Sequence, residues 1–385
     1  MSISFLFKCI TYLLLASFSS ACGENNPQQQ QNNIQTVESP EKNAPSFKVD
    51  TLLTGLQNPW GMAFLPDNRI LITEREGQIL IVKDGVLQGQ RVQGVPQVYA
   101  MGQGGLMDIT LHPDYRKNGW IYFSYSKPGN SGATTTVARA KLNGNRFTNL
   151  EEVFRVSPFI SSGVHFGCRI VFDGKGYMFI STGERGTKQN AQDLNTHNGK
   201  VIRLHDDGSV PADNPFVKRA GAKPEIWSYG HRNIQGMVYD AATNTLWSHE
   251  HGPRGGDEVN IVEKGKNYGW PVVTHGIDYD GSTISRIKEK QGIQSPLHVW
   301  TPSIAPCGMT LVTSNRYTGW KGNLLVGALA HKHVARLEVK NKRIVNEEKL
   351  LKKIGRVRAV SQSPDGFIYV LTEGPGMFLR LTPAR

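Results

Sequence analysis

A strand–turn–strand pattern recurs six times along the chain, and it constrains the fold more than any other feature of the sequence. Each copy combines an apolar run, a short turn and a second run rich in β-branched and aromatic residues. The copies span Trp60–Thr73, Gly105–Ser126, Gly167–Thr182, Gln235–Glu250, Cys307–Leu329 and Val357–Glu373. A unit of this size cannot bury both of its faces alone, so neighbouring units must stack. The sequence therefore predicts an all-β fold, a six-bladed β-propeller with four-stranded antiparallel blades.

Turn residues between the copies agree with many short strands. Asp84-Gly85 and Asn143-Gly144 are typical of the tight turns that join the second hairpins. The 41 glycines and 20 prolines are spread along the chain in turn-like positions. A pair of packed β-sandwiches is the structural alternative, although that fold would not require six similar units. The copies are unevenly spaced, and in a propeller the extra residues become loops on one face, where sites are built.

The first 46 residues have a different character from the rest. Residues 1–21 contain one lysine, an apolar run Ile10–Phe18 and three small residues, which predicts an export signal too short to span a membrane. Cys22 follows those small residues, so we expect it to be lipidated and to anchor an exported, periplasmic protein in the outer membrane. Cleavage with release is the alternative. Residues 22–46 are rich in Gln and Asn and predict a disordered tether, which leaves 47–385 for the propeller.

The net charge of +12 raises the question of nucleic-acid binding. The lysines and arginines are scattered, and no basic stripe or nucleic-acid motif is present. We therefore expect no nucleic-acid partner. No extra interface element is recognisable either, which favours a monomer.

The stretch Tyr229–Trp270 concentrates residues suited to chemistry. His231-Arg232-Asn233 provides an imidazole, a fixed cation and an amide in a row. His251–Glu258 is too rich in Gly and Pro for a strand interior, so it predicts a loop. Its free carbonyls and adjacent carboxylates suit a hard cation, which prefers oxygen ligands. A solvated loop between strands is the plainer interpretation of the same residues.

Several motifs in one order give the chain a family resemblance. They are the runs His165–Glu184 and Gly199–Phe216, followed by the YGHRN, HGPRGGDE and GKNYGWP motifs of the Tyr229–Pro271 segment. The chain resembles the soluble pyrroloquinoline quinone (PQQ)-dependent glucose and aldose sugar dehydrogenases from about Gly55 to Leu381, and the bacterial aldose branch most. The resemblance implies oxidation of aldose sugars at C1 to lactones, with PQQ and Ca²⁺ as cofactors and an electron acceptor that the sequence does not identify.

A planar quinone with three carboxylates needs a cationic pocket. Arg356 and Arg358 alternate along one strand, which directs both side chains to the same side. Arginine binds carboxylates through paired hydrogen bonds, and lysine adds a point charge. Surface exposure is the common alternative for such residues. The resemblance implies these cofactor contacts: Gln103, Arg232, Asn233, Tyr279, Lys332, Arg356 and Arg358.

His165 is the candidate general base, because an imidazole titrates nearest to neutral pH and can take the proton of a sugar hydroxyl. Most of the 11 histidines are expected to be structural. Gly163 and Gly167 nevertheless predict an exposed loop before a strand at His165, and the family's catalytic histidine falls on this position. Arg232 would stabilise the developing oxygen charge. Glu184 would orient His165 or form a salt bridge with Arg185.

The resemblance also implies two calcium sites. The carbonyls of Gly252 and Pro253 correspond to ligands of the ion that contacts the quinone. Glu258 and the carbonyl of Tyr268 correspond to a second, structural site in the aldose branch. Spacing alone is a weak signal here, since no EF-hand loop is present.

Cys168 and Cys307 both begin a repeat, so we expect both on inner strands. We predict a disulfide between them, which an oxidising periplasm would permit. Two small buried thiols are the alternative.

Two other function classes remain open at this point. Six-bladed propellers also host calcium-dependent lactonases and esterases, which would need no cluster of cations around one pocket. A non-enzymatic binding propeller would need no base at His165. Fold alone does not decide among the three.

Overall fold

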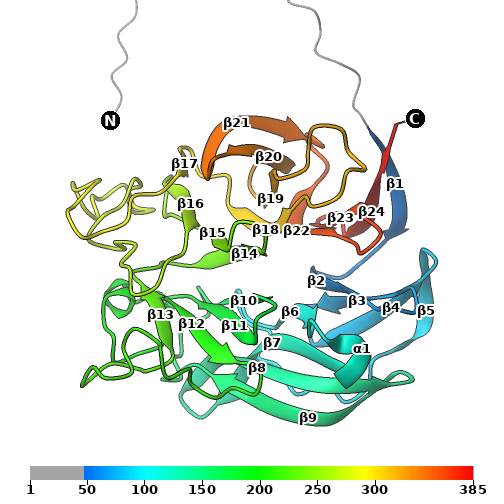
Figure 1. Ribbon diagram of the computed structural model, residues 1–385, viewed down its shortest axis with the longest axis horizontal. Coiled ribbons are helices and arrows are strands. Elements are labelled where there is room, and N and C mark those ends of the chain that lie inside the picture. Colours follow the sequence, from blue (N-terminus) through cyan, green and yellow to red (C-terminus); the bar gives the residue numbers. More distant parts are fainter. Residues whose placement is uncertain (1–46, 385) are drawn as a thin grey trace, which may run out of the picture. The chain divides into compact units, whose positions relative to one another are not determined.

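The computed structural model describes residues 47–384, and these form six four-stranded antiparallel sheets arranged as blades around a central channel (Figure 1). The prediction of a six-bladed β-propeller is confirmed. The predicted signal peptide 1–21, the lipidation site Cys22 and the tether 22–46 lie outside the described residues. In the part of the chain that is described, no helix is long and apolar enough to cross a membrane.

Each predicted copy supplies the first and second strands of one blade, counted from the channel outward. The first strands are β2 (Pro59–Phe64), β6 (Leu106–Leu111), β10 (Gly167–Phe172), β14 (Ile234–Asp240), β18 (Pro306–Leu311) and β22 (Arg356–Gln362). The second strands are β3 (Arg69–Glu74), β7 (Trp120–Gly129), β11 (Tyr177–Thr182), β15 (Thr245–Glu250), β19 (Leu324–Ala328) and β23 (Ile368–Glu373).

The outer half of each blade follows the same order. The third strands are β4 (Gln78–Lys83), β8 (Gly132–Asn143), β12 (Lys200–His205), β16 (Asp257–Ile261), β20 (His333–Lys340) and β24 (Met377–Pro383). The fourth strands are β5 (Val86–Arg91), β9 (Arg146–Arg155), β13 (Ile226–Tyr229), β17 (His298–Trp300), β21 (Arg343–Leu350) and β1 (Phe47–Thr54). The only helical turns among residues 47–384 are α1 (Tyr115–Asn118) and the 3₁₀ turn η1 (Lys188–Ala191).

The first strand of the described chain closes the ring. β1 pairs with β24 in the antiparallel sense, with Phe47 opposite Pro383. The last blade is thereby built from both ends of the propeller, so its strands cannot separate without opening the ring.

The turns follow from the residues that form them. Asp84 and Gly85 have φ of 49° and 77° and join β4 to β5, as the dipeptide predicts. The second predicted turn is displaced by one residue, because Asn143 pairs with Arg146 as the last residue of β8.

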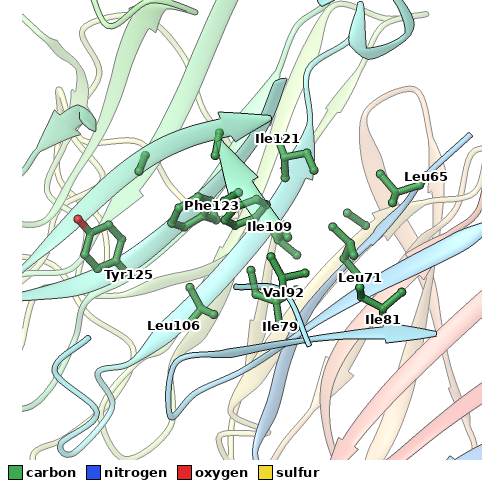
Figure 2. Packing of buried hydrophobic residues seen from close by; sticks show 14 residues of the cluster. Leu65, Leu71, Ile79, Ile81, Val92, Leu106, Ile109, Ile121, Phe123 and Tyr125 are labelled. Atoms are coloured by element: carbon green, nitrogen blue, oxygen red, sulfur yellow. The ribbon is translucent and has the colours of Figure 1, made fainter. Parts of the chain in front are cut away.

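The hydrophobic core lies between adjacent blades. In the first interface, Leu71 and Ile79 of one blade pack with Leu106, Ile109 and Phe123 of the next, all nearly inaccessible to solvent (Figure 2). Burying each such side chain contributes about 1.5–3 kcal/mol. Middle strands covered on both faces therefore read as continuous apolar runs in the sequence.

The predicted disulfide is wrong: Cys168 and Cys307 are both buried free thiols. Cys168 packs with Trp60, Met107 and other apolar residues, and burial raises the pKa of its thiol well above the ordinary value. The sulfur of Cys307 instead accepts a hydrogen bond from Nη1 of Arg358 at 3.3 Å. Both cysteines therefore lie on inner strands as expected, but their sulfurs are not bonded to each other.

Candidate active site

A cavity of about 230 Å³ lies at one end of the channel. The strands explain its position, because the start of each first strand lies beside the end of the antiparallel second strand. Arg356 begins β22 and Glu373 ends β23, and the two residues are paired across the sheet. The polar residues that line the cavity come from four blades and are Arg75, Gln103, Asn233, Gln235, His251, Arg356, Arg358 and Glu373.

His165 lies directly before β10, and its ring is held by a buried carboxylate. Nδ1 of His165 is 2.9 Å from Oε1 of Glu184, whose side chain is 2% exposed. Burial lowers the pKa of His165, the Glu184 contact raises it, and the charges of Arg232 and Arg185 lower it further. The net shift is downward, so the imidazole is neutral at neutral pH. Its proton lies on Nδ1, facing the carboxylate, and Nε2 is left as a proton acceptor.

The backbone around His165 is held by two residues that were predicted as cofactor contacts, the amides Gln103 and Asn233. Oε1 of Gln103 accepts a hydrogen bond from the backbone N–H of His165 at 2.9 Å, and Oδ1 of Asn233 accepts one from Gly167 at 3.1 Å. His165 has a φ of 54°, a left-handed conformation that costs free energy in a non-glycine residue. Its carbonyl lies so close to Gly183 that a Cβ there would be 2.0 Å away, so only glycine fits.

Arg185 does not form the salt bridge with Glu184 that was the alternative. Its side chain is buried and donates to the carbonyls of Val164 at 2.9 Å and Ala133 at 2.8 Å, and also to Ser162. The guanidinium stacks on Phe166 at 3.7 Å. Burial lowers the pKa of Arg185 to about 10. Glu184 therefore holds the His165 ring, while Arg185 holds the backbone that carries it.

Arg232 is buried and does not line this cavity itself, although the next residue, Asn233, does. Its backbone N–H donates to Oε2 of Glu250 at 2.6 Å, and Nη1 donates to the carbonyl of His251 at 3.2 Å. Nε of Arg232 is buried without a hydrogen-bond partner in the described structure. Nη2 lies 3.5 Å from the hydroxyl of Tyr279, whose residue is 67% exposed. The guanidinium thus has donor capacity that no described residue uses.

Arg356 and Arg358 line the cavity together, as strand alternation predicts. Nε of Arg358 donates to Oε1 of Glu373 at 2.7 Å, and Nε of Arg356 lies 3.5 Å from Oε2 of the same carboxylate. Arg75, a third cation, lines the same cavity and donates to the carbonyl of Gly102 at 2.8 Å. Lys332 does not join this group: it is exposed and does not line the cavity.

Gly252 of the first predicted calcium site lines the same small cavity as Glu258 and Tyr268 of the second. A space of about 10 Å³, the size of a single water molecule or ion, is lined by Gly252, Glu258, Tyr268 and Glu250, among others. Burial raises the pKa of Glu258 to about 8, and the neighbouring carboxylate of Glu250 raises it too. Both carboxylates line this cavity, and so does Arg232. Pro253 lies next to this cavity in the chain but does not line it.

Side chains alone do not form a metal centre here. Across residues 47–384, no group of three or more His, Cys, Asp or Glu side chains is arranged to hold a metal ion. The loop nevertheless offers backbone oxygens: no described hydrogen-bond donor contacts the carbonyls of Gly252 and Pro253. Gly252 has no room for a side chain, because a Cβ would lie 2.3 Å from the carbonyl of Gly256. The candidate donors are thus carboxylates together with backbone oxygens.

Sequence reasoning missed Arg75 and Glu373. Glu373 is the last residue of the second strand of its repeat, and Arg75 directly follows such a strand, in the motifs TEG (372–374) and TER (73–75). Glu184 and Glu250 stand at the corresponding places of two other blades. Alignment of the repeats on their second strands would have identified this ring of charged residues, since equivalent strand ends meet at the same end of the channel.

Comparisons with known proteins identify the family of the chain. The profile of the Glucose / Sorbosone dehydrogenase family matches residues 56–380. The aldose sugar dehydrogenase YliI of Escherichia coli (strain K12) is 45% identical over 88% of this chain and 93% of its own length.

Two solved structures extend the similarity to the fold. The crystal structure of the soluble aldose sugar dehydrogenase from Escherichia coli in the apo-form is similar with a TM-score of 0.85 and 42% identity, covering 88% of this chain and all of that one. The PQQ-bound aldose sugar dehydrogenase from Streptomyces coelicolor has a TM-score of 0.72 and 27% identity, over 88% of this chain and 99% of that one. This chain therefore belongs to the glucose/sorbosone dehydrogenase family, the family of the soluble PQQ-type glucose dehydrogenases.

Proposed function

We propose that the protein oxidises aldose sugars at C1 to the corresponding lactones, with PQQ as the hydride acceptor and Ca²⁺ as a second cofactor. Members of this family are sugar oxidoreductases, and the relatives named above are aldose sugar dehydrogenases. The observation that carries the proposal is the contact of His165 with Glu184, directly before Phe166 and Gly167, which line a cavity that contains three arginines.

The residues present fit a bound PQQ. Arg75, Arg356 and Arg358 provide positive charge for its carboxylates, and Arg232 has a buried Nε without a partner. Gln103 and Asn233 add amide donors at the wall nearest to His165. Lys332 and Tyr279 are exposed in the structure and are the weaker members of the proposed set. When bound, PQQ supplies a quinone that takes up the hydride of C1.

The residues also fit Ca²⁺, a hard cation that prefers oxygen ligands. The carbonyls of Gly252 and Pro253 would hold the ion that contacts the quinone and polarises it. Glu258 and the carbonyl of Tyr268 would hold a structural ion in the small cavity next to Glu250.

The chain's own residues would act on the sugar as follows. Nε2 of His165 accepts the proton of the C1 hydroxyl, and the positive charge that forms on the imidazole is balanced by Glu184. The C–H bond at C1 breaks in the same process, and the carbon–oxygen double bond of the lactone forms. Arg232 stabilises the negative charge that develops on the C1 oxygen as the proton leaves. A positioned base contributes about 10²- to 10⁴-fold to the rate.

Neither alternative function has an observation in its favour. A calcium-dependent lactonase would have no use for the three arginines of the cavity, and a binding module would have no use for the contact between His165 and Glu184. We also propose that the protein is exported, anchored through Cys22 in the outer membrane, monomeric, and active with an acceptor on the periplasmic side. No nucleic-acid partner is part of the proposal.

Product analysis with labelled substrate tests the position of oxidation. Protein loaded with PQQ and Ca²⁺ is given glucose and glucose deuterated at C1, with an artificial dye as acceptor. We expect gluconolactone or its hydrolysis product and a primary isotope effect on the rate. Oxidation at another carbon would contradict the proposal. A different product, formed at a rate that deuterium at C1 does not change, would contradict it as well.

A further inference from the structure

The carboxylate of Glu373 contacts both arginines of β22 on the same edge of their guanidinium groups. Oε1 lies 2.7 Å from Nε of Arg358, and Oε2 lies 3.5 Å from Nε of Arg356. Arg356 and Glu373 are directly paired across β22 and β23, so the backbone register brings the three side chains together. One carboxylate thus accepts a hydrogen bond from Arg358 and forms a longer ion pair with Arg356, in both cases at Nε.

The outer ends of the two guanidinium groups are much less occupied. Nη1 of Arg358 contacts the sulfur of Cys307 at 3.3 Å, and Nη1 of Arg356 donates to the carbonyl of Leu329 at a long 3.4 Å. Within residues 47–384, no acceptor is hydrogen-bonded to Nη2 of either arginine. Arginine binds a carboxylate best through two parallel N–H groups, and these ends are the ones that remain available.

Glu373 is ionised in this environment. Burial raises the pKa of Glu373, but the charges of Arg358, Arg356 and Arg75 outweigh burial and leave the pKa below its ordinary value. The group therefore contains three cations and one anion. A simple charge count would make Glu373 unfavourable for an acidic ligand, because it offsets part of the positive charge.

We propose that Glu373 is a positioning residue of this cavity, which holds Arg356 and Arg358 by their Nε atoms so that their outer N–H groups face a polycarboxylate ligand. Without it, each arginine would lose the contact that fixes its guanidinium plane. The inference rests on the proposed function, since the polycarboxylate is PQQ. It adds a residue that acts on the cofactor only through the two arginines.

If Glu373 only offsets positive charge, its neutralisation should tighten PQQ binding. If it positions the two arginines, the same change should weaken binding, so an equilibrium binding measurement decides between them. The calcium-loaded protein without PQQ is titrated with PQQ, followed by the absorbance change of the quinone, for the wild type, Glu373→Gln and Glu373→Asp. We expect Glu373→Gln to raise the Kd at least tenfold despite the removal of a negative charge. Glu373→Asp, which is shorter but keeps the charge, should give an intermediate Kd.

Glu76→Gln is the matched control. Glu76 is exposed, and its carboxylate lies 3.9 Å from Nη2 of Arg75 at the edge of the same cavity, without a contact to Arg356 or Arg358. We expect its Kd to stay within twofold of the wild type. Thermal melting identifies any variant that does not fold, and Glu373→Asp then carries the test.

Two results would overturn the inference, and they differ in meaning. If the wild type binds PQQ, and Glu373→Gln or Glu373→Asp binds it as tightly or more tightly, the positioning role of Glu373 is wrong. That result leaves the proposed function intact. If the folded wild type does not bind PQQ, the proposed function is contradicted, and the inference about Glu373 is contradicted with it.

Discussion

The buried carboxylate of Glu184 contacts the partly buried imidazole of His165, with Oε1 2.9 Å from Nδ1. The pair decides which ring nitrogen carries the proton, so Nε2 is the atom that can act as a base. His165 also sits in a left-handed backbone conformation that Gln103 and Arg185 help to hold. The local strain is offset by contacts from the same blade and from a neighbouring one, which is the arrangement expected of a functional loop on a rigid scaffold.

Replacement of the base is the first prediction. His165→Gln should lower kcat by about 10²- to 10⁴-fold, because no other positioned group takes the hydroxyl proton. The affinity for PQQ should change little, since His165 is not one of the cations of the cavity. Steady-state kinetics and PQQ titration check both values. His205→Gln, at the end of β12 and away from the cavity, is the control, and equal losses in the two variants would speak against the assignment.

The pH dependence of activity follows from the lowered pKa of His165. Because the base must be neutral and its pKa lies below the ordinary 6.5, the activity should persist at pH 6.5 and fall only at lower pH. The Glu184 contact raises this pKa, so Glu184→Gln should move the acid limb of kcat/KM to still lower pH while it decreases kcat. A pH–rate profile of both proteins tests the sign. An acid limb above pH 6.5 in the wild type would contradict the account.

Arg185 should be needed both for stability and for turnover. Arg185→Lys keeps the charge but cannot reach the carbonyls of Val164, Ala133 and Ser162 together, so buried carbonyls would lose their donors at a cost of about 1–3 kcal/mol each. We expect a lower melting temperature and a kcat loss of about tenfold with little change in KM. Arg219→Lys, an exposed arginine on a loop, should stay within about 0.5 kcal/mol of the wild type. Unchanged kcat in a folded Arg185→Lys protein would refute this role.

Calcium should stabilise the fold through the small cavity. Ca²⁺ in excess should raise the melting temperature of the metal-free protein, because an ion that binds only the folded state adds stability by mass action. Glu258→Gln should abolish most of this increase, whereas Glu263→Gln, an exposed neighbour on the same segment, should retain it. Differential scanning calorimetry with and without chelator gives the comparison. A full calcium response in Glu258→Gln would exclude the proposed ligand.

The thiols can be counted directly. A chain of residues 47–385 contains Cys168 and Cys307, and we expect two titratable thiols after denaturation without reductant. The native protein should expose none, because both are buried. No thiol in the denatured protein would mean that a disulfide forms after all.

The fold was predictable because the six copies are local signals. Each copy carries its own turn and its own apolar runs, so the period is visible without knowledge of the packing. The pairing of the closing strand β1 was not predictable. Phe47–Thr54 pairs with Met377–Pro383 at the other end of the chain, and neither segment contains a sequence signal that identifies its partner strand.

The candidate site was predictable in part. Arg356 and Arg358 meet because two residues on one strand share a side, a relation that the sequence contains. Their contact with Glu373 depends on the register of β22 and β23, which the sequence leaves open. The disulfide prediction was wrong for a related reason. Position on inner strands brings both cysteines to the channel, but it does not determine whether their sulfurs meet. The sulfur of Cys307 instead accepts a hydrogen bond from Arg358. Lys332 was placed by resemblance alone, and the structure has it exposed.

The most direct test of the central claim is reconstitution. Metal-free protein produced without PQQ is mixed with Ca²⁺ and increasing PQQ, and glucose oxidation is followed with an artificial dye. The account predicts no activity before PQQ is added and activity that saturates near one PQQ per chain. Activity in the absence of PQQ, or none at saturating PQQ and Ca²⁺ with any aldose, would contradict it.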